Sequence, residues 1–468
     1  MKALRVPLFF LLILFGFLSN GIAAIRLPAI YASHMVIQQN AKMTFWGWAG
    51  PSETVEISFS WNGKTEKVVA TRDAKWSLQI TTPTAGGPYT ISFKASNTIV
   101  LEDILVGEVW LCSGQSNMEW SSLNGNKQAI AELPNASNSN IRLFNIPKTT
   151  SVYPQDNCYA QWETCSPEAM KSFSAVGYFF GKKLQKDLSV PIGLINASWG
   201  GTAAEVWTPQ EVIENDIEFK QAMSLSGVTP WWPVEPGKAY NAMIAPLTSF
   251  PIAGAIWYQG ESNTAKAESY SRLFTSMIKS WRKAWDSEFP FYYVQIAPFT
   301  YGTPFEGPLL REAQTRAQWL PKTGMVVISD LVDNVQDIHP QNKLDVATRL
   351  ANWALAETYG KSVGAYKSPQ YRSMSTETGR IRIQFDFAPN GLISKNGAVT
   401  GFEIAGDDRI FYPATAIIEG TSVLVSALQV KSPVAVRFGF QNESMPNLFS
   451  KEGLPVDMFR TDGWRVRK

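Results

Sequence analysis

Residues 104–120 read ILVGEVWLCSGQSNMEW, and this stretch decides the expected fold. Its first half is an almost continuous apolar run, which is typical of a strand buried on both faces of a parallel sheet. A glycine ends the run, and polar residues follow directly in CSGQSNMEW, residues 112–120. Ligands bind at the carboxyl ends of strands in open α/β sheets, so this strand end is a candidate site.

Beyond this stretch, apolar strand-like runs alternate with helical stretches. The runs are VWLCSG, PIGLINAS, AGAIWYQG, FYYVQIAP and GMVVISD, and the helical stretches cover residues 174–188, 269–285, 309–320 and 342–360. Strand–helix alternation predicts a mostly parallel sheet covered by helices on both faces. We therefore expect an α/β catalytic domain over residues 106–362.

Both flanks of this region have the pattern of β structure. Residues 25–105 contain short alternating runs broken by Gly, Pro and Asn, which predicts a small β-sandwich. Residues 363–468 return to alternation, for example in RIRIQFDFA and VLVSALQV, which predicts a C-terminal β-rich domain. A chain of 468 residues is too long for one ordinary core, in agreement with this division.

The first 24 residues have the pattern of a secretory signal peptide. Lys2 and Arg5 precede an apolar run over residues 6–18, and small residues follow it up to Ala24. The run is shorter than the ~20 residues of a membrane-spanning helix, which favours cleavage over an uncleaved anchor. We expect a mature protein that is periplasmic or secreted and has no membrane partner.

Composition excludes several classes of partner and cofactor. The formal net charge of +2 comes with no long Lys/Arg block, so no nucleic-acid partner is expected. Only two histidines are present, so we expect no metal cluster of the usual His/Cys spacing and no cofactor. Cys158 and Cys165 are close enough in sequence to form a disulfide, whereas Cys112 is expected to be a buried, inert thiol.

Four predicted strand ends carry polar groups that together suit acyl transfer. This chemistry needs a nucleophile, a base, and hydrogen-bond donors for the developing oxyanion. The four segments supply a serine, backbone N–H groups beside glycines, an asparagine amide and a histidine, in that order. They are CSGQSNMEW (112–120), NASWGGTAAEVW (196–207), IWYQGESN (256–263) and DNVQDIHP (333–340).

The base must be one of the two histidines. His34 lies in the N-terminal β region, far in sequence from the predicted strand ends, so His339 is expected to serve. The G-x-S-x-G elbow of ordinary α/β-hydrolases is absent, because Met118 stands where its second glycine would be. The pattern therefore favours the other Ser–His architecture that is built on a parallel sheet.

The set GQSNM, GGTAAEVW, QGESN and DIHP resembles the sialate O-acetylesterase family within the SGNH hydrolases. SHMVIQQ near the start and GFEIAG, NLFSKEGLP and FRTDGW near the end also look like that family, so the resemblance spans nearly the whole mature chain. It implies an SGNH-type, flavodoxin-like three-layer α/β domain flanked by N- and C-terminal β-domains. It also implies a carboxylic ester hydrolase that removes acetyl groups from sugars, with sialic acid suggested by the family name and acetylated xylan as the alternative.

The resemblance further implies roles for the residues at matching positions. Ser116 would attack the acetyl carbonyl, and His339 would take the serine proton and pass it to the departing sugar hydroxyl. The backbone N–H of Ser116 and that of Gly201 (or Gly200) would hold the oxyanion together with the Asn263 side chain.

The group that orients His339 is left open. The SGNH pattern places an aspartate three residues before the histidine, where this chain has Gln336. Asp337, two residues before, is the expected third member, and Gln336 or a main-chain carbonyl is the alternative. Asp330 and Asp333 remain further candidates, although each could simply cap a helix or a turn.

A second set of residues is expected to contact the sugar, namely Gln115, Glu205, Trp207, Gln259 and Glu261. Glu205 and Glu261 also support a rival interpretation as the paired carboxylates of a glycosidase. A non-catalytic carbohydrate-binding protein is a second rival. The Ser–Gly–Asn–His set favours the esterase, because neither rival needs it.

Overall fold

A twisted sheet at the centre of the molecule has the order β13-β12-β11-β7-β10-β8-β9. The computed structural model describes residues 24–466, and every pair along this path is parallel except β8–β9. Without the edge strands β8 and β9, the strands run 2-1-3-4-5 in chain order, so the order reverses between β7 and β11. The strands are β7 (Thr98–Gly114), β8 (Asn138–Asn145), β9 (Trp162–Cys165), β10 (Ile192–Ser198), β11 (Gly254–Tyr258), β12 (Phe291–Val294) and β13 (Thr323–Val326).

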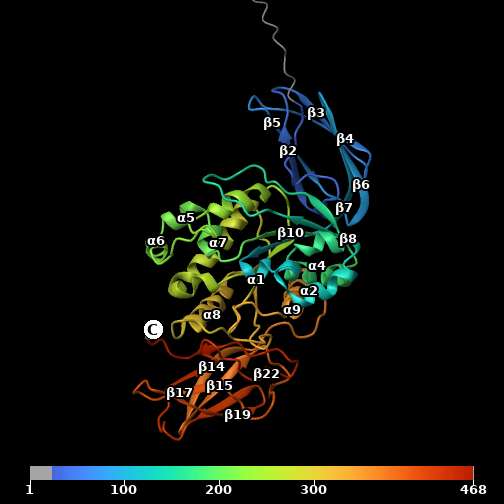
Figure 1. The fold of residues 1–468 in the computed structure, drawn as a ribbon. Helices are drawn as coiled ribbons and strands as arrows, with labels where there is room; N and C mark the ends of the chain where they lie inside the picture. Colours follow the sequence, from blue (N-terminus) through green and yellow to red (C-terminus); the bar gives the residue numbers. More distant parts are fainter. Residues whose placement is uncertain (1–23, 467–468) are drawn as a thin grey trace, which may run out of the picture.

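Helices cover both faces of this sheet (Figure 1). On one face α4 (Ala175–Leu188) packs against α9 (Lys343–Trp353), and on the other α7 (Ala267–Trp285) packs against α8 (Glu306–Arg316). The amphipathic pattern of α7 buries its apolar side chains against β11 and β12, and the buried face of α4 lies against β7 and β10. These layers confirm the α/β expectation. The shorter helices are α1 (Ser116–Glu119), α2 (Lys127–Glu132), α3 (Pro167–Lys171), α5 (Gln210–Glu214) and α6 (Ile217–Met223).

Strand β7 is shared by the N-terminal β region and the central sheet of the α/β region. Its first half pairs with β6 and β1 in the N-terminal β region, and its second half is the central strand between β10 and β11. The boundary expected between residues 105 and 106 therefore falls inside a continuous strand, which fixes the two layers to each other. The N-terminal strands, blue in Figure 1, are β1 (Val36–Gln38), β2 (Lys42–Trp48), β3 (Thr54–Phe59), β4 (Lys64–Val69), β5 (Lys75–Thr81) and β6 (Gly86–Lys94).

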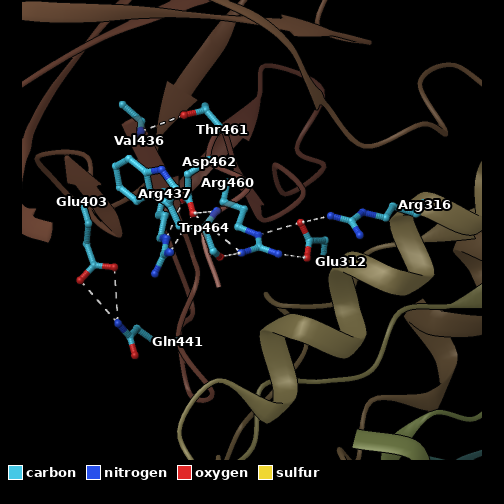
Figure 2. A network of polar contacts seen from close by, with 10 residues as sticks. All are labelled: Glu312, Arg316, Glu403, Val436, Arg437, Gln441, Arg460, Thr461, Asp462 and Trp464. Carbon is cyan, nitrogen blue, oxygen red and sulfur yellow. Dashed lines mark hydrogen bonds and ion pairs between the residues drawn. The ribbon is translucent and has the colours of Figure 1, made fainter. Parts of the chain in front are cut away.

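The strands after residue 369 surround an apolar cluster of their own and lie against α8. Arg460 in β23 makes two hydrogen bonds of 2.9 Å to Glu312 in α8, and Arg437 in β21 makes two of 2.9 Å to Asp462 (Figure 2). The strands are β14 (Gln370–Glu377), β15 (Arg380–Asp386), β16 (Leu392–Ser394), β17 (Phe402–Ala405), β18 (Phe411–Pro413), β19 (Thr415–Glu419), β20 (Ser422–Ser426), β21 (Ala435–Phe438), β22 (Leu448–Ser450) and β23 (Phe459–Arg460).

The expected disulfide between Cys158 and Cys165 is wrong, because both residues are free, buried thiols. The Cys165 Sγ donates to the Ala136 carbonyl at 3.0 Å, and the two cysteines belong to different apolar clusters. Closeness in sequence therefore did not bring the two side chains together. Burial raises the pKa of each to about 12, and it also raises the pKa of Cys112, which is buried as expected.

The signal peptide expected over residues 1–24 lies outside the described residues, apart from its last residue. Between residues 24 and 466, no helix is both long enough and apolar enough to cross a bilayer.

Candidate active site

Ser116 stands at the end of the central strand, where the strand order reverses. Strand β7 stops at Gly114, and α1 begins at Ser116 after a single extended residue, Gln115. The Gln115 N–H donates to the Tyr258 carbonyl at 3.0 Å, and the Trp199 N–H donates to the Gly114 carbonyl at 3.0 Å. The ends of β10 and β11 therefore hold this turn from both sides, which points the first helical residue out of the sheet edge.

His339 lies against Ser116, although 223 residues separate the two in sequence. The distance from its Nε2 to the Ser116 Oγ is 2.9 Å. Trp120, in the turn after Ser116, stacks on the imidazole with ring centroids 4.5 Å apart. His34 is instead half exposed, and its Nδ1 lies 2.7 Å from Asp103. Of the two histidines, the structure thus brings His339 to the serine.

The imidazole of His339 is favoured in its neutral form. Burial lowers its pKa first, and the positive charge of Lys343 lowers it further. Asp337 and Glu119 act in the opposite direction without reversing the shift. A neutral imidazole 2.9 Å from a hydroxyl can accept the hydroxyl proton, as general-base catalysis requires.

Two residues that line the same cavity have backbone N–H groups without a partner among residues 24–466. They are Ser116, the first residue of α1, and Gly201, whose φ is +81°. The Gly200 N–H, an alternative donor, is bound by the Glu119 carboxylate at 2.5 Å. Gly201 is therefore the better placed of the two glycines for an incoming oxyanion.

Asn263 is fully buried and does not line the cavity that Ser116 and Gly201 share. Its Oδ1 accepts from the Ala204 N–H at 2.9 Å and from Gln259 at 2.7 Å, and its Nδ2 donates to Glu205 at 2.8 Å. The second amide hydrogen of Asn263 has no partner within the described part of the chain. Asn263 thus ties the glycine loop to the segment after β11 and keeps one N–H free.

A buried polar network lies directly beneath Ser116 and His339. The Asn117 Nδ2 donates to Glu261 at 2.7 Å and to the Ile338 carbonyl at 3.0 Å. The Lys343 Nζ donates to the Asn117 Oδ1 at 2.6 Å and lies 5.6 Å from the ring centre of Trp120. Burial lowers the pKa of Lys343 to about 7 and raises that of Glu261. The network links the serine turn to the residue before His339.

Among the candidate orienting residues, which all lie in the described part of the chain, only Asp337 has a side-chain contact with His339. Its Oδ1 lies 3.7 Å from the His339 Nδ1, beyond hydrogen-bond distance, and accepts the His339 backbone N–H at 2.9 Å. Asp330 is held by two hydrogen bonds of 2.7 Å from Arg349. The side chains of Gln336 and Asp333 make no hydrogen bond to the ring among the described residues.

The residues expected to contact the sugar divide into two groups. Gln115 and Glu261 line the cavity above Ser116. Glu205, Trp207 and Gln259 do not line it: each is at most 1% exposed, and Glu205 forms an ion pair of 2.7 Å with Lys266. Trp207 and Gln259 instead donate hydrogen bonds to Thr202, next to Gly201, and so hold the loop that contains Gly200 and Gly201. The same burial removes Glu205 as one of two carboxylates flanking a glycosidic bond.

Sequence reasoning missed Glu119, Trp120 and Lys343. Glu119 and Trp120 follow Ser116 by three and four residues, so the helical repeat would have placed them on the serine's face. Nothing in the sequence distinguishes Lys343 from an exposed lysine in the first turn of a helix, since its burial depends on Asn117, 226 residues away.

Comparisons with known proteins show the family of this chain. A family model described as "Carbohydrate esterase, sialic acid-specific acetylesterase" matches residues 106–356. Human sialate O-acetylesterase is 31% identical over 398 residues, covering 76% of this chain and 75% of the human protein, and that of Pongo abelii gives the same figures. The crystal structure of a carbohydrate acetylesterase from Xanthomonas citri matches 94% of this chain and 100% of its own, with 37% identity and a TM-score of 0.86. The chain therefore belongs to the sialic acid-specific acetylesterase family of carbohydrate esterases, and it is a carboxylic ester hydrolase.

Proposed function

We propose that this enzyme removes O-acetyl groups from sugars through an acetyl-enzyme on Ser116, with an SGNH-type catalytic domain. The observation that carries the proposal is the 2.9 Å contact between the Ser116 Oγ and the His339 Nε2, at the point where the strand order reverses. The free N–H groups of Ser116 and Gly201 add donors for a negative charge beside the nucleophile.

In the first half of the reaction, the Ser116 Oγ attacks the acetyl carbonyl while His339 accepts its proton. The tetrahedral oxyanion is held by the N–H groups of Ser116 and Gly201, while Asn263, which is fully buried and does not line the cavity, positions the glycine loop through its hydrogen bond to the Ala204 N–H. When the ester C–O bond breaks, the imidazolium returns the proton to the sugar oxygen, and a sugar hydroxyl leaves. Water then attacks the acetyl-serine with His339 as base, releasing acetate and restoring Ser116.

We further propose that Asp337 acts on His339 by its charge rather than by a direct hydrogen bond. Its carboxylate lies 3.7 Å from the Nδ1, is 44% exposed, and raises the pKa of the imidazole. An exposed carboxylate at this distance stabilises the imidazolium weakly, because solvent screens the interaction. The chemistry then depends chiefly on Ser116 and His339, with Asp337 as a minor third member.

Replacing Ser116 by Ala tests the mechanism. We expect acetate release to fall at least about 1,000-fold, because the acetyl-enzyme can no longer form. Ser262→Ala is the matched control, since Ser262 lines the same cavity but its Oγ donates to the Gly201 carbonyl at 2.9 Å and has no histidine beside it. A smaller effect is expected there. Intact turnover by the Ser116→Ala variant would refute the acetyl-enzyme, and failure of an organophosphate to label Ser116 would show that its hydroxyl is not activated as a nucleophile.

A further inference from the structure

Glu119 is the last residue of α1 and shares this one-turn helix with Ser116. Its side chain lines the cavity above Ser116, and both of its carboxylate oxygens have partners. The Oε2 accepts the Gly200 backbone N–H at 2.5 Å, and the Oε1 accepts from the Lys148 ammonium at 2.5 Å. The carboxylate therefore joins the nucleophile helix to the loop that contains Gly200 and Gly201.

This glycine loop is packed directly on the nucleophile turn. A Cβ added at Gly200 would lie 3.2 Å from the Glu119 Oε2 and 3.3 Å from the Ser116 Cβ. On the other side of the loop, the Gly201 carbonyl accepts a hydrogen bond of 2.9 Å from the Ser262 hydroxyl. The peptide unit between the two glycines thus has a fixed peptide unit before it and another after it.

Two consecutive glycines offer little resistance to rotation of the peptide unit between them. Glycine populates positive and negative φ about equally, and Gly201 already has a φ of +81°. Rotation of the Gly200–Gly201 peptide would turn its N–H away from the cavity and present a carbonyl oxygen, which repels an oxyanion. Fixing the loop therefore matters for the rate, because the developing charge is stabilised by donors that are already in place.

We propose that Glu119 is a positioning residue for the oxyanion site: by holding the Gly200 N–H, it keeps the Gly201 N–H directed at the acetyl oxygen. Glu119 acts through the loop and need not touch the substrate. The assignment rests on the proposed function, since it concerns the same Ser116 site.

The charge of Glu119 has a second effect, on the base. Burial and the positive charge of Lys343 lower the pKa of His339, whereas Asp337 and Glu119 raise it. Lys148 is the cation paired with the Glu119 carboxylate itself. Glu119 therefore helps to stabilise the imidazolium that forms during acyl transfer.

Glu119→Asp and Glu119→Gln separate the hydrogen bond from the charge. Aspartate keeps the charge, but its shorter side chain does not reach the Gly200 N–H, so kcat for 4-nitrophenyl acetate should fall at least about tenfold with little change in KM. Glutamine keeps an oxygen that accepts this N–H, so kcat should stay within about threefold of the wild type. Its lost charge lowers the His339 pKa further, so only Glu119→Gln should move the acid limb of the kcat/KM profile to lower pH.

Glu168→Asp is the matched control, because Glu168 is an 85% exposed glutamate in another short helix, α3, and lies outside the cavity. It should leave kcat and the pH profile unchanged. An unchanged kcat in Glu119→Asp would overturn the proposal. Equal losses of kcat in Glu119→Asp and Glu119→Gln would also overturn it, since holding the Gly200 N–H would then make no difference.

A cycle of single and double variants tests whether Glu119 acts through the loop. Gly200→Ala places a methyl group against the Glu119 carboxylate, whereas the methyl group of Gly463→Ala, the control, meets nothing within 4 Å. If Glu119 acts through Gly200, combining Glu119→Asp with Gly200→Ala should reduce kcat no more than the more damaging single variant does. Independent roles would multiply the two losses and contradict the proposal.

Failure of this inference is distinguishable from failure of the proposed function. If hydrolysis of 4-nitrophenyl acetate requires Ser116 but is equally fast in Glu119→Asp and the wild type, the role of Glu119 alone is refuted. If hydrolysis survives Ser116→Ala, the acetyl-enzyme mechanism itself is refuted, and the oxyanion role of the loop with it.

Discussion

Lys343, in the first turn of α9, contacts the turn that carries Ser116. Its ammonium is fully buried, donates to Asn117 at 2.6 Å, and lies over the rings of Trp120 and Tyr258 at 5.6 and 5.3 Å. Because Trp120 stacks on His339, one cation fixes both the serine turn and the ring above the base. Lys343 is therefore a positioning residue, acting through Asn117 and Trp120.

Replacing Lys343 by Met should lower kcat/KM by about 10- to 100-fold, since small misplacements of catalytic groups have effects of this order. The pH profile should change as well. The His339 pKa lies below 6.5, so activity falls as the pH drops through that lowered value. Loss of the Lys343 charge removes one cause of the lowering, so the acid limb of the kcat/KM profile should move to higher pH.

Lys361→Met is the matched control for charge loss, because Lys361 is exposed and lies outside the cavity. It should leave the acid limb in place. An acid limb that does not move in Lys343→Met would contradict the electrostatic link between Lys343 and His339, even if turnover fell.

At the scale of elements, the end of β7 decides where the nucleophile stands. Gly114 has a φ of +136°, and a Cβ added there would lie 2.2 Å from the Tyr258 carbonyl oxygen of β11. That contact is with backbone and cannot be relieved by turning a side chain. The strand end and the neighbouring β11 can therefore approach each other only with glycine at this position.

Gly114→Ala should lower the free energy of unfolding by more than about 4 kcal/mol and displace Ser116, because it combines backbone strain with a backbone clash. Gly63→Ala separates the two causes, since Gly63 has a φ of +66° and nothing within 4 Å of the added Cβ. Strain alone should then lower stability by about 1–2 kcal/mol. Chemical denaturation of both variants, with acetate release as a second readout, checks the difference, and equal losses would refute the clash.

The elements that could be predicted from the sequence are those that bury a continuous or periodic set of apolar side chains. Continuous apolar runs identified β7, β10 and β11, and the helical period identified α4 and α7, because each buries a face regardless of its partners. The edge pair β8 and β9 was not predicted, since its residues mix apolar and polar types and pairing gives them their shape.

The same distinction applies within the site. Three of the four polar segments follow β7, β10 and β11, which finish at one edge of the sheet, so Ser116 and Gly201 could be grouped from the sequence. The expectation that His339 follows a strand end is wrong, because β13 ends at Val326 and His339 lies in the loop before α9. Asn263 and Glu205 were expected to contact the oxyanion and the sugar, respectively. Both are instead buried below the cavity, where they hydrogen-bond to each other. Lys343 depends on a contact between distant segments, which no local pattern reveals.

At the scale of the whole molecule, the C-terminal β strands are joined to the α/β layer by buried polar contacts. Asp457, just before β23, accepts hydrogen bonds of 2.8 Å from Gln295 after β12 and from Thr315 in α8. Burial raises its pKa from 3.8 to about 6, although Arg311 and these donors act to lower it. Beside it, Arg460 and Glu312 in Figure 2 form a second connection to α8.

The raised pKa of Asp457 makes this connection sensitive to pH with a definite sign. A carboxyl group whose folded pKa exceeds its unfolded value stabilises the fold fully below about pH 3.8, and the contribution is lost as the pH rises through about 6. Asp457→Asn keeps the shape and removes the charge. It should therefore raise the free energy of unfolding at pH 7.5 by on the order of 3 kcal/mol, and change it little at pH 4.

Asp462→Asn is the matched comparison, because the same substitution at a second buried aspartate should have the opposite effect. The Asp462 carboxylate accepts two hydrogen bonds of 2.9 Å from Arg437, so its loss leaves a buried guanidinium uncompensated and should destabilise the protein by about 3–5 kcal/mol. Denaturant unfolding of both variants at pH 4 and pH 7.5 distinguishes the two cases. Destabilisation by Asp457→Asn at pH 7.5 would mean that Asp457 is ionised and that its charge balances Arg311. The contact between the two layers would then be an ion pair rather than hydrogen bonds to a protonated carboxyl group.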